Sequence, residues 1–524
     1  MKFSSKILKC QLSPVRKFNP CADQAVAAGR TIYHLNIGQP DVKTPESFYQ
    51  AVREFREPTL EYAPASGLPA YIDAVRGYYA KLGVKLERED ILATSGGGEA
   101  LEFIMACILD DGDELLVPEP FYANYNTFTF MSGGVIHPIP TSADNGYRFA
   151  DRELIESQIN ERTRAILVTN PGNPTGLVLT HEEMRVIADV VKEHDLFLVA
   201  DEVYREFIYD DEPMGTFCEM EDIKDHVIVV DSISKRFSAC GARIGSIISR
   251  NREFMAEAMK LCQGRLCTAT LDQAGAAAMY EHVQPSYFKE VRDEYKKRRD
   301  AVVEELNKIP GTKFHTPDGA FYMMVTLPVD DVEKLQYFLL EEFEDNGDTV
   351  MYAPGSGFYA DPADGRSEIR IAYVHNCDYL RRAIQLLGKG IAAYNAMCLL
   401  ERWQELTDVI GEFEDNGLPL LGGALGTDPR RLLEYFAAHG VDCTPCKKGA
   451  LVPGVYVCSY TALSLLKEAR GLHTAALRVT ASGVEVYNEC DDAAVTARYP
   501  TAAAFFKGKT VAALFRVTAG ETAH

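Results

Sequence analysis

Between about residues 91 and 250 the chain alternates short apolar runs with helical patterns, and this alternation restricts the fold more than any other feature of the sequence. Short apolar runs bounded by turn residues are typical of buried strands. Strands that alternate with helices predict an α/β domain built on a mostly parallel sheet, here with seven strands. The predicted strands cover residues 91–95, 114–118, 135–140, 164–169, 197–201, 227–231 and 243–249.

Ligands of α/β folds gather at the carboxyl ends of parallel strands, so the residues after each predicted strand are candidates for a binding site. After the first strand, three glycines that include Gly97 and Gly98 open a helix predicted over 99–108. Backbone N–H groups at such a helix start suit an anion, although the glycines can also form a plain turn. After the second strand, Tyr122 can stack on a planar ring or pack beneath a loop.

Two later strand ends carry polar side chains. Asn173 follows the fourth strand in a segment made rigid by proline and glycine, and its amide is free to donate or accept a hydrogen bond. Asp201 ends the fifth strand. A buried carboxylate there requires a cationic partner, which a protonated pyridine nitrogen or a structural arginine would provide.

The sixth strand leads into residues 231–245, where Ser232, Lys235 and Arg243 lie on a short strand-to-loop segment. A lysine at a buried strand end can lose its proton through desolvation and become a nucleophile towards aldehydes. Hydroxyl and guanidinium groups nearby suit a phosphate dianion. An amine beside a phosphate site indicates pyridoxal 5'-phosphate held as a Schiff base, and the alternative is a solvated Lys–Arg pair after a strand.

Taken together, residues 1 to about 395 resemble the class I aminotransferases, which are fold-type I pyridoxal-phosphate enzymes. Residues 232–245 fit that family's lysine motif, and the other matching pieces occur in the expected order. The resemblance implies that Lys235 forms the Schiff base, that Asp201 pairs with the pyridine nitrogen and that Tyr122 stacks on the ring. The resemblance also implies that Tyr204 and Asn173 contact the phenolic oxygen of the cofactor. It implies that the phosphate is held by Gly97, Gly98, Ser232 and Arg243. The family's site lies at a homodimer interface, across which Tyr62 would reach the phosphate of the neighbouring subunit.

The substrate side of the site is expected around Arg370. It lies in residues 368–374, where apolar and polar residues alternate as in a half-buried strand. Arg370 matches the family arginine that binds the substrate α-carboxylate in a bidentate fit, and a surface arginine on a strand is the alternative. The resemblance adds Gly38 and Asn173 to the substrate-binding residues.

These assignments predict an aminotransferase of amino acid metabolism that moves an amino group between an L-amino acid and a 2-oxo acid. Lys235 would move the proton at the substrate Cα. A lyase or decarboxylase on the same fold is an alternative. A pyridoxal-phosphate-sensing regulator would need a helix-turn-helix domain ahead of this part, and the chain has neither the room nor the basic charge for one. Arg265 is either a second carboxylate site or a solvated residue of a helix surface.

Charge and cysteine content restrict the partners. The 524 residues include 54 Lys and Arg against 76 Asp and Glu, a formal net charge of −22, which argues against nucleic acid. No apolar run reaches membrane-spanning length, and the first residues lack the apolar region of a signal peptide. The 13 scattered cysteines indicate reduced thiols and a cytoplasmic protein. The lone pair Cys443 and Cys446 has no second pair, so we expect no metal.

The chain extends beyond the part that resembles the family. We expect a cofactor-binding large domain over residues 49–290, a small domain that combines 1–48 with 291–395, and a C-terminal accessory α+β domain over 396–524. In the accessory domain, residues 396–410 and 428–439 are predicted helices. Residues 455–460, 474–480 and 483–488 are predicted strands, the last two joined as a hairpin.

The hairpin and residues 421–429 resemble papain-like cysteine peptidase domains, in which a histidine and an asparagine partner a cysteine. His473 and Asn488 lie at the ends of the hairpin strands and are expected to be cross-strand neighbours. The position of the cysteine falls near Lys389, and Cys398 comes about two helical turns later. We therefore expect a degenerate, non-catalytic domain, with an amide-cleaving second activity as the alternative.

Overall fold

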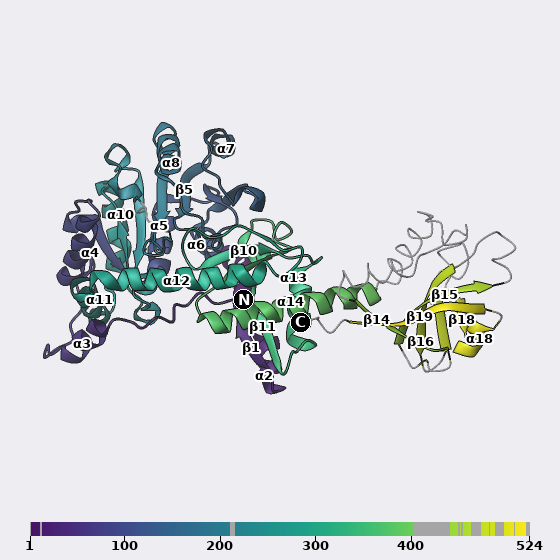
Figure 1. Cartoon of the computed structure of the whole chain (residues 1–524). Coiled ribbons are helices and arrows are strands. Elements are labelled where there is room, and N and C mark those ends of the chain that lie inside the picture. The colour runs from purple at the N-terminus through teal and green to yellow at the C-terminus, as the bar shows by residue number, and fades with distance from the viewer. Residues whose placement is uncertain are drawn as a thin grey trace. The chain divides into compact units, whose positions relative to one another are not determined.

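The computed structural model describes residues 2–10, 13–209, 215–401, 441–448, 451, 454–462, 473–480, 483–487, 497–507 and 509–519 (Figure 1). The chain divides into two compact units, Met1–Gln385 and Leu386–His524. The division falls inside one helix, α14 (Cys377–Glu401), whereas the sequence analysis places it at residue 395. Among the described residues, no helix combines the length and the apolar character needed to cross a bilayer.

A seven-stranded sheet forms the centre of the first unit, as the alternation of strands and helices predicts. Its strand order is β2-β8-β7-β6-β5-β3-β4. The strands are β2 (Ile91–Thr94), β3 (Glu114–Pro118), β4 (Val135–Ile139), β5 (Thr163–Thr169), β6 (Phe197–Asp201), β7 (Val227–Ser232) and β8 (Gly245–Ile248). The five adjacent strands β7, β6, β5, β3 and β4 pair in parallel. Strand β8 is antiparallel to both of its neighbours, β7 and β2. Consequently β2 and β7 run in the same direction, and the ends of β2, β3, β5, β6 and β7 meet at one edge.

The last strand begins later than the sequence predicts. Arg243 has a left-handed backbone with φ 55°, which a strand cannot continue, so β8 begins at Gly245. A Cβ on Gly245 would lie 2.7 Å from the carbonyl carbon of Gly96 and 2.8 Å from the carbonyl oxygen of Asp231. Glycine at this position therefore allows the loop after β2 to lie directly against β8.

Helices cover both faces of this sheet. One apolar core contains buried side chains of α4 (Pro69–Lys81), α8 (His181–Glu193) and α11 (Thr270–His282), and the other contains those of α5 (Gly97–Ile108), α6 (Asn124–Ser132) and α10 (Arg252–Arg265). Successive residues of β7 alternate between the cores, with Val229 in the first and Val230 in the second, as the strand period requires. This part also contains α3 (Glu46–Glu54), α7 (Arg152–Gln158) and α12 (Pro285–Leu306).

Helix α4 illustrates how the sequence specifies its elements. Pro69 occupies the first turn, where a missing N–H costs nothing. Tyr71, Val75 and Tyr78 recur at helical spacing, and all are buried in the core. Helix α5 begins at Gly97, two residues before its predicted start, so the glycines themselves form its first turn.

Two smaller sheets complete the first unit. The four-stranded sheet has the order β12-β13-β10-β9, and β1 pairs in parallel with β11. The strands are β1 (Thr31–His34), β9 (Lys313–Phe314), β10 (Tyr322–Thr326), β11 (Asp348–Met351), β12 (Ala353–Pro354) and β13 (Glu368–Ala372). Helices α2 (Asn19–Ala27) and α13 (Val332–Glu341) lie against these strands, whereas α1 (Ser5–Lys9) contacts α6. The pairing of β1 with β11 places the N-terminal residues beside a strand from far later in the chain.

The second unit contains a six-stranded antiparallel sheet with the order β14-β19-β15-β16-β17-β18. Its elements are β14 (Val441–Pro445), β15 (Gly454–Ala462), β16 (His473–Thr480), β17 (Gly483–Tyr487), β18 (Ala497–Tyr499), α18 (Ala502–Phe506) and β19 (Lys509–Ala519). Side chains such as Tyr456, Leu477 and Phe505 form its core. Strands β16 and β17 pair as the predicted hairpin, from Thr480 opposite Gly483.

The hairpin register bears on the peptidase resemblance. His473 pairs with Tyr460 of β15, and the described pairing of β16 with β17 ends at Ala476 opposite Tyr487. Asn488 lies outside the described residues, as do residues 421–429, the predicted helix 428–439 and residues 402–410 of the other predicted helix. Residues 396–401 belong to α14.

Candidate active site

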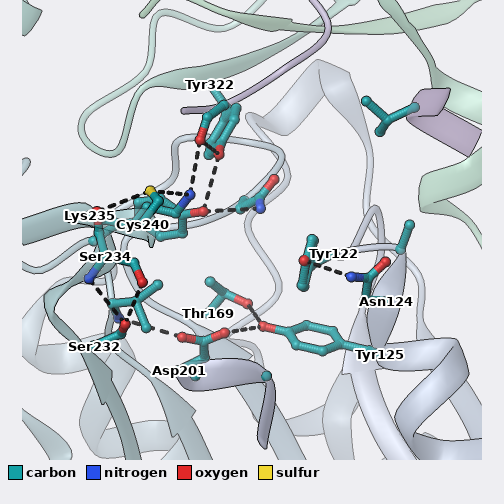
Figure 2. Close-up of a pocket in the computed structure, with 18 of the residues that line it drawn as sticks. Tyr122, Asn124, Tyr125, Thr169, Asp201, Ser232, Ser234, Lys235, Cys240 and Tyr322 are labelled. Atoms are coloured by element: carbon teal, nitrogen blue, oxygen red, sulfur yellow. Dashed lines mark hydrogen bonds between the residues drawn. The ribbon is translucent and has the colours of Figure 1, made fainter. Parts of the chain in front are cut away.

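A cavity of about 710 Å³ lies where the strand ends of the large sheet meet. It brings together all but one of the residues that the sequence analysis assigns to a site: Gly38, Gly97, Gly98, Tyr122, Asn173, Asp201, Tyr204, Ser232, Lys235, Arg243 and Arg370. The exception is Tyr62, which is 80% exposed and does not line this cavity. In Figure 2, Lys235 and Tyr322 lie close together, and Asp201 lies with Tyr125 and Thr169.

The short helix α9 (Ile233–Arg236) presents Lys235 to the cavity. The hydroxyl oxygen of Ser232, the last residue of β7, caps this helix by accepting a hydrogen bond of 3.1 Å from the Ser234 N–H. Lys235 Nζ donates a hydrogen bond of 2.9 Å to the Gly38 carbonyl oxygen, and Cys240 Sγ lies 3.9 Å from Nζ. The amine therefore has a defined position within the cavity.

The next residue, Arg236, anchors the same helix in the protein interior. Its side chain is fully buried, and Nη1 donates to Asp231 Oδ2 over 3.0 Å and to Tyr280 Oη over 2.6 Å. A buried guanidinium is costly without such partners, so these contacts hold the helix in one position. The position of Lys235 follows from this anchor.

Asp201 is the buried acid of the cavity wall. Its carboxylate is 5% exposed and accepts hydrogen bonds from Tyr125 Oη over 2.7 Å and from the Val203 N–H over 3.5 Å. Burial raises the pKa of the Asp201 carboxyl to about 6, although the Tyr125 hydrogen bond acts in the opposite direction. A cationic group in the cavity would stabilise the ionised form.

One end of the cavity offers donors for an anion. Gly97 and Gly98 form the first turn of α5, where N–H groups have no helical partner. A Cβ on Gly96, with φ 83°, would lie 2.5 Å from Arg243 Nη2, so only glycine allows this approach. Arg243 Nη2 donates to the Ser95 carbonyl oxygen over 3.2 Å, and the Ser232 hydroxyl lies at the same end.

Arg370 lies at another wall, on β13, and is 4% exposed. Nη1 donates to Asn173 Oδ1 over 3.2 Å and Nη2 to the Asn36 carbonyl oxygen over 2.7 Å, while the buried Nε has no partner. Burial lowers the pKa of this guanidinium, and the ionisable groups that act on it within the described ranges are tyrosines and not acids. A buried cation with a free N–H is suited to an anionic ligand.

Phenol and amide groups connect these walls. Tyr204 Oη accepts a hydrogen bond of 3.3 Å from Asn173 Nδ2 and lies 3.2 Å from Tyr322 Oη. Tyr122 Oη accepts from Asn124 Nδ2 over 2.8 Å, which fixes its ring at the cavity wall. Asn173 thus contacts Arg370 through its oxygen and Tyr204 through its nitrogen.

Comparison with known proteins decides the family. The model of the family described as aminotransferase class I and II matches residues 30–387. The chain belongs to this family. A probable aspartate/prephenate aminotransferase of Aquifex aeolicus is 30% identical over 398 residues, which cover 74% of this chain and 98% of that protein. An aspartate aminotransferase of Bacillus subtilis is 26% identical over 405 residues, 75% of this chain and 100% of the relative.

Solved aminotransferase structures agree with this assignment. The aspartate aminotransferase of Thermus thermophilus with maleate is 26% identical, covers 74% of this chain and 100% of its own, and superposes with a TM-score of 0.68. An alanine aminotransferase of Pyrococcus furiosus is 29% identical with a TM-score of 0.67, over 74% of this chain and 99% of its own. The aminotransferase assignment therefore covers the first unit, and the family match ends before the tail.

Several residues of the aminotransferase cavity were not predicted from the sequence. Arg16, Asn36 and Tyr322 line it, and Arg236 anchors the lysine helix. Arg16 and Asn36 come from an N-terminal segment without periodic signal. Tyr322 begins β10, and only the pairing of that strand with β13 shows which way its hydroxyl points.

The structure places Arg265 outside the cavity. Its Nη2 donates to the Ala93 carbonyl oxygen over 3.1 Å, and its Nε lies 3.8 Å from a Glu99 carboxylate oxygen. Arg265 thus lies apart from the other predicted site residues, and its side chain is packed against Glu99 and Phe103 of α5 rather than solvated.

Proposed function

We propose that this aminotransferase uses pyridoxal 5'-phosphate to move an amino group between an L-amino acid and a 2-oxo acid. The supporting observation is that one cavity holds the Lys235 amine, the buried Asp201 carboxylate and the Arg370 guanidinium with an unpartnered N–H. These three groups suit a reaction in which three partners are held at once. The amine would meet a carbonyl group, the acid a ring nitrogen and the guanidinium a carboxylate.

The donor set of the cavity fits this cofactor. When bound, pyridoxal phosphate supplies an aldehyde that condenses with amines and a ring that withdraws electrons from the substrate Cα. Asp201 would face the ring nitrogen, whose positive charge would compensate the buried carboxylate. The other residues that would hold the cofactor are Gly97, Gly98, Ser232, Ser234 and Arg243 at the phosphate, Tyr204 and Asn173 at the phenolic oxygen, and Tyr122 at the ring face.

The substrate would be held by Arg370 and acted on by Lys235. The Arg370 Nε N–H finds no acceptor in the described protein, so a substrate carboxylate would satisfy it. The rings of Tyr322 and Phe358, 4.5 and 4.9 Å from the guanidinium, shield that contact from water. Lys235 Nζ would act as the general base that takes the proton from the substrate Cα.

A dicarboxylic amino acid such as aspartate is our first candidate donor. Arg16, from the N-terminal segment, also lines the cavity. It is a second cation there beside Arg370. A second carboxylate on the substrate would match this second cation. The relatives named aspartate aminotransferases support the same choice.

Tyr62 supports the proposal of a homodimer. It is 80% exposed, Leu60 is 60% exposed, and both line one surface hollow together with residues 267–272. Exposed apolar side chains of this size on one surface are typical of a protein interface. We propose that a second copy covers this surface and that Tyr62 reaches the phosphate end of the partner's cavity.

The test uses the full chain with pyridoxal phosphate. We expect a visible absorbance band, borohydride-dependent attachment of the cofactor to Lys235 detected by mass spectrometry, and conversion of the band by aspartate when aspartate, phenylalanine and alanine are compared. Lys235→Ala should abolish attachment and transamination, whereas the exposed control Lys224→Ala should keep both. Full turnover of 2-oxo acids by Lys235→Ala would refute the assignment, and release of carbon dioxide or ammonia would indicate a decarboxylase or lyase.

A further inference from the structure

We propose that Tyr322 is a positioning residue of this site, with its hydroxyl group orienting Lys235 and its ring supporting Arg370. This inference rests on the proposed function and adds a residue to it. The Tyr322 side chain contacts three parts of the cavity that come from distant points of the sequence: Gly38, Tyr204 and Arg370. Each of these contacts has a separate consequence.

The hydroxyl group acts through the Gly38 carbonyl oxygen. Tyr322 Oη donates to this oxygen over 3.3 Å, and Lys235 Nζ donates to the same oxygen over 2.9 Å. Tyr322 Oη also lies 3.2 Å from Tyr204 Oη. A carbonyl that serves two donors is fixed in direction and accepts less strongly from each of them. The Tyr322 hydroxyl therefore holds the acceptor of the Lys235 amine in place.

The ring acts on Arg370. The guanidinium carbon lies 4.5 Å from the ring centroid, a distance at which a desolvated cation is attracted to an aromatic face. Arg370 is 4% exposed, and its Nη2 donates to the carbonyl oxygen of Asn36, two residues before Gly38. The ring and the chain segment from Asn36 to Gly38 thus keep the guanidinium in one orientation while its Nε remains available.

Gly38 provides an independent indication that this packing is tight. A Cβ on Gly38 would overlap the hydroxyl and ring atoms of Tyr322, although the backbone of Gly38 is not in the left-handed region. The absence of a side chain at position 38 is therefore required by the Tyr322 ring and not by the backbone conformation. Position 38 and position 322 should then respond to mutation as a coupled pair.

The principal experiment separates the hydroxyl group from the ring. Tyr322→Phe should lower kcat/KM about tenfold, through kcat rather than KM, because the Gly38 carbonyl that positions Lys235 then loses its second donor. Its dissociation constant for maleate, a dicarboxylate analogue, should stay within about twofold of the wild type. Tyr322→Leu should in addition weaken maleate binding about fivefold, because the ring is lost.

Tyr352→Phe is the matched control. Tyr352 Oη donates a hydrogen bond of 2.7 Å to the Val332 carbonyl oxygen, and Tyr352 does not line the cavity. A wild-type kcat in Tyr322→Phe would overturn the role of the hydroxyl group. Equal maleate affinity in Tyr322→Phe and Tyr322→Leu would overturn the role of the ring. A wild-type protein that neither holds the cofactor nor transaminates would instead refute the proposed function.

A second measurement needs no cofactor. Gly38→Ala should lower the Tm of the cofactor-free protein by about 3 °C or more in the wild-type background. The same change should lower it much less in Tyr322→Leu, because the smaller side chain leaves room for a methyl group. Equal losses of Tm in the two backgrounds would show that position 38 does not pack against Tyr322 in the way described.

Discussion

Tyr125 donates a hydrogen bond of 2.7 Å to the Asp201 carboxylate, and this contact connects α6 to the end of β6. Asp201 is nevertheless so buried that its pKa is raised to about 6 from an ordinary value of 3.8. The hydrogen bond therefore offsets only part of the cost of burying the charge. A buried carboxyl that is ionised at neutral pH destabilises the cofactor-free protein and favours the binding of a cation in the cavity.

Asp201→Asn should therefore stabilise the cofactor-free protein above pH 6 while it lowers transamination by at least about 100-fold. Because the folded-state pKa is raised, the contribution of Asp201 to stability falls as pH rises from about 4 to 6 and stays lower above that range. The variant should gain about 2 to 3 kcal/mol at pH 8 and nothing near pH 4. Denaturant unfolding at both pH values measures this difference in the free energy of unfolding between variant and wild type. Asp23→Asn, an exposed position on α2, is the control, and a gain that is independent of pH would contradict the prediction.

Arg370→Lys should raise KM for amino acids strongly and change kcat less. The lysine ammonium keeps the charge but cannot reproduce the planar donor fork that contacts Asn173 and the Asn36 carbonyl oxygen. We expect kcat/KM to fall about 100-fold, measured by steady-state kinetics. Arg265→Lys, a half-buried arginine outside the cavity, should stay close to wild type. An unchanged KM in Arg370→Lys would exclude it as the carboxylate-binding group.

Arg16→Gln should reduce the preference for dicarboxylic donors. Removing one cation from the cavity wall should lower kcat/KM for aspartate about tenfold and leave that for alanine within about twofold. Lys17→Gln is the neighbouring control, because Lys17 pairs with Glu333 and does not line the cavity. Equal losses with both substrates would mean that Arg16 does not contact the substrate side chain.

Tyr62→Ala should weaken cofactor binding about tenfold if Tyr62 reaches the partner's phosphate end. Mixed dimers provide the sharper measurement. A hybrid of Tyr62→Ala and Lys235→Ala subunits contains one cavity with both native residues, so activity at limiting cofactor should return on mixing. Activity that stays at the level of the separate variants would place Tyr62 outside any shared site.

The C-terminal unit should show no peptidase chemistry. Cys398 lies on α14, two helical turns beyond the position that the papain-like resemblance requires, and His473 pairs with Tyr460 in the neighbouring strand β15. A thiol-directed peptidase probe should therefore not label Cys398 stoichiometrically, as measured by mass spectrometry of the labelled chain. Stoichiometric labelling that is lost in His473→Ala would instead support an active amide hydrolase.

Local pattern alone predicted the large sheet and much of its functional edge. The alternation of strands and helices is a short-range property, and several strand ends carry or precede a residue that lines the cavity, as with Asp201 at the end of β6 and Lys235 three residues after β7. Parallel strands bring such residues to one edge whatever their separation in the chain. Where a local backbone irregularity intervenes, as at Arg243 with φ 55°, the predicted strand boundary was wrong.

Only the tertiary structure decided which distant groups touch. The contact of Arg370 with Asn173 joins residues 197 positions apart, and the approach of Tyr322 to Gly38 spans 284 positions. No periodicity in a sequence reports contacts of that range, because they depend on how β10 and β13 pair and on where the N-terminal segment crosses the cavity. The sequence determined which chemical groups reach the edge of the sheet, and packing between its remote segments determined how those groups are held.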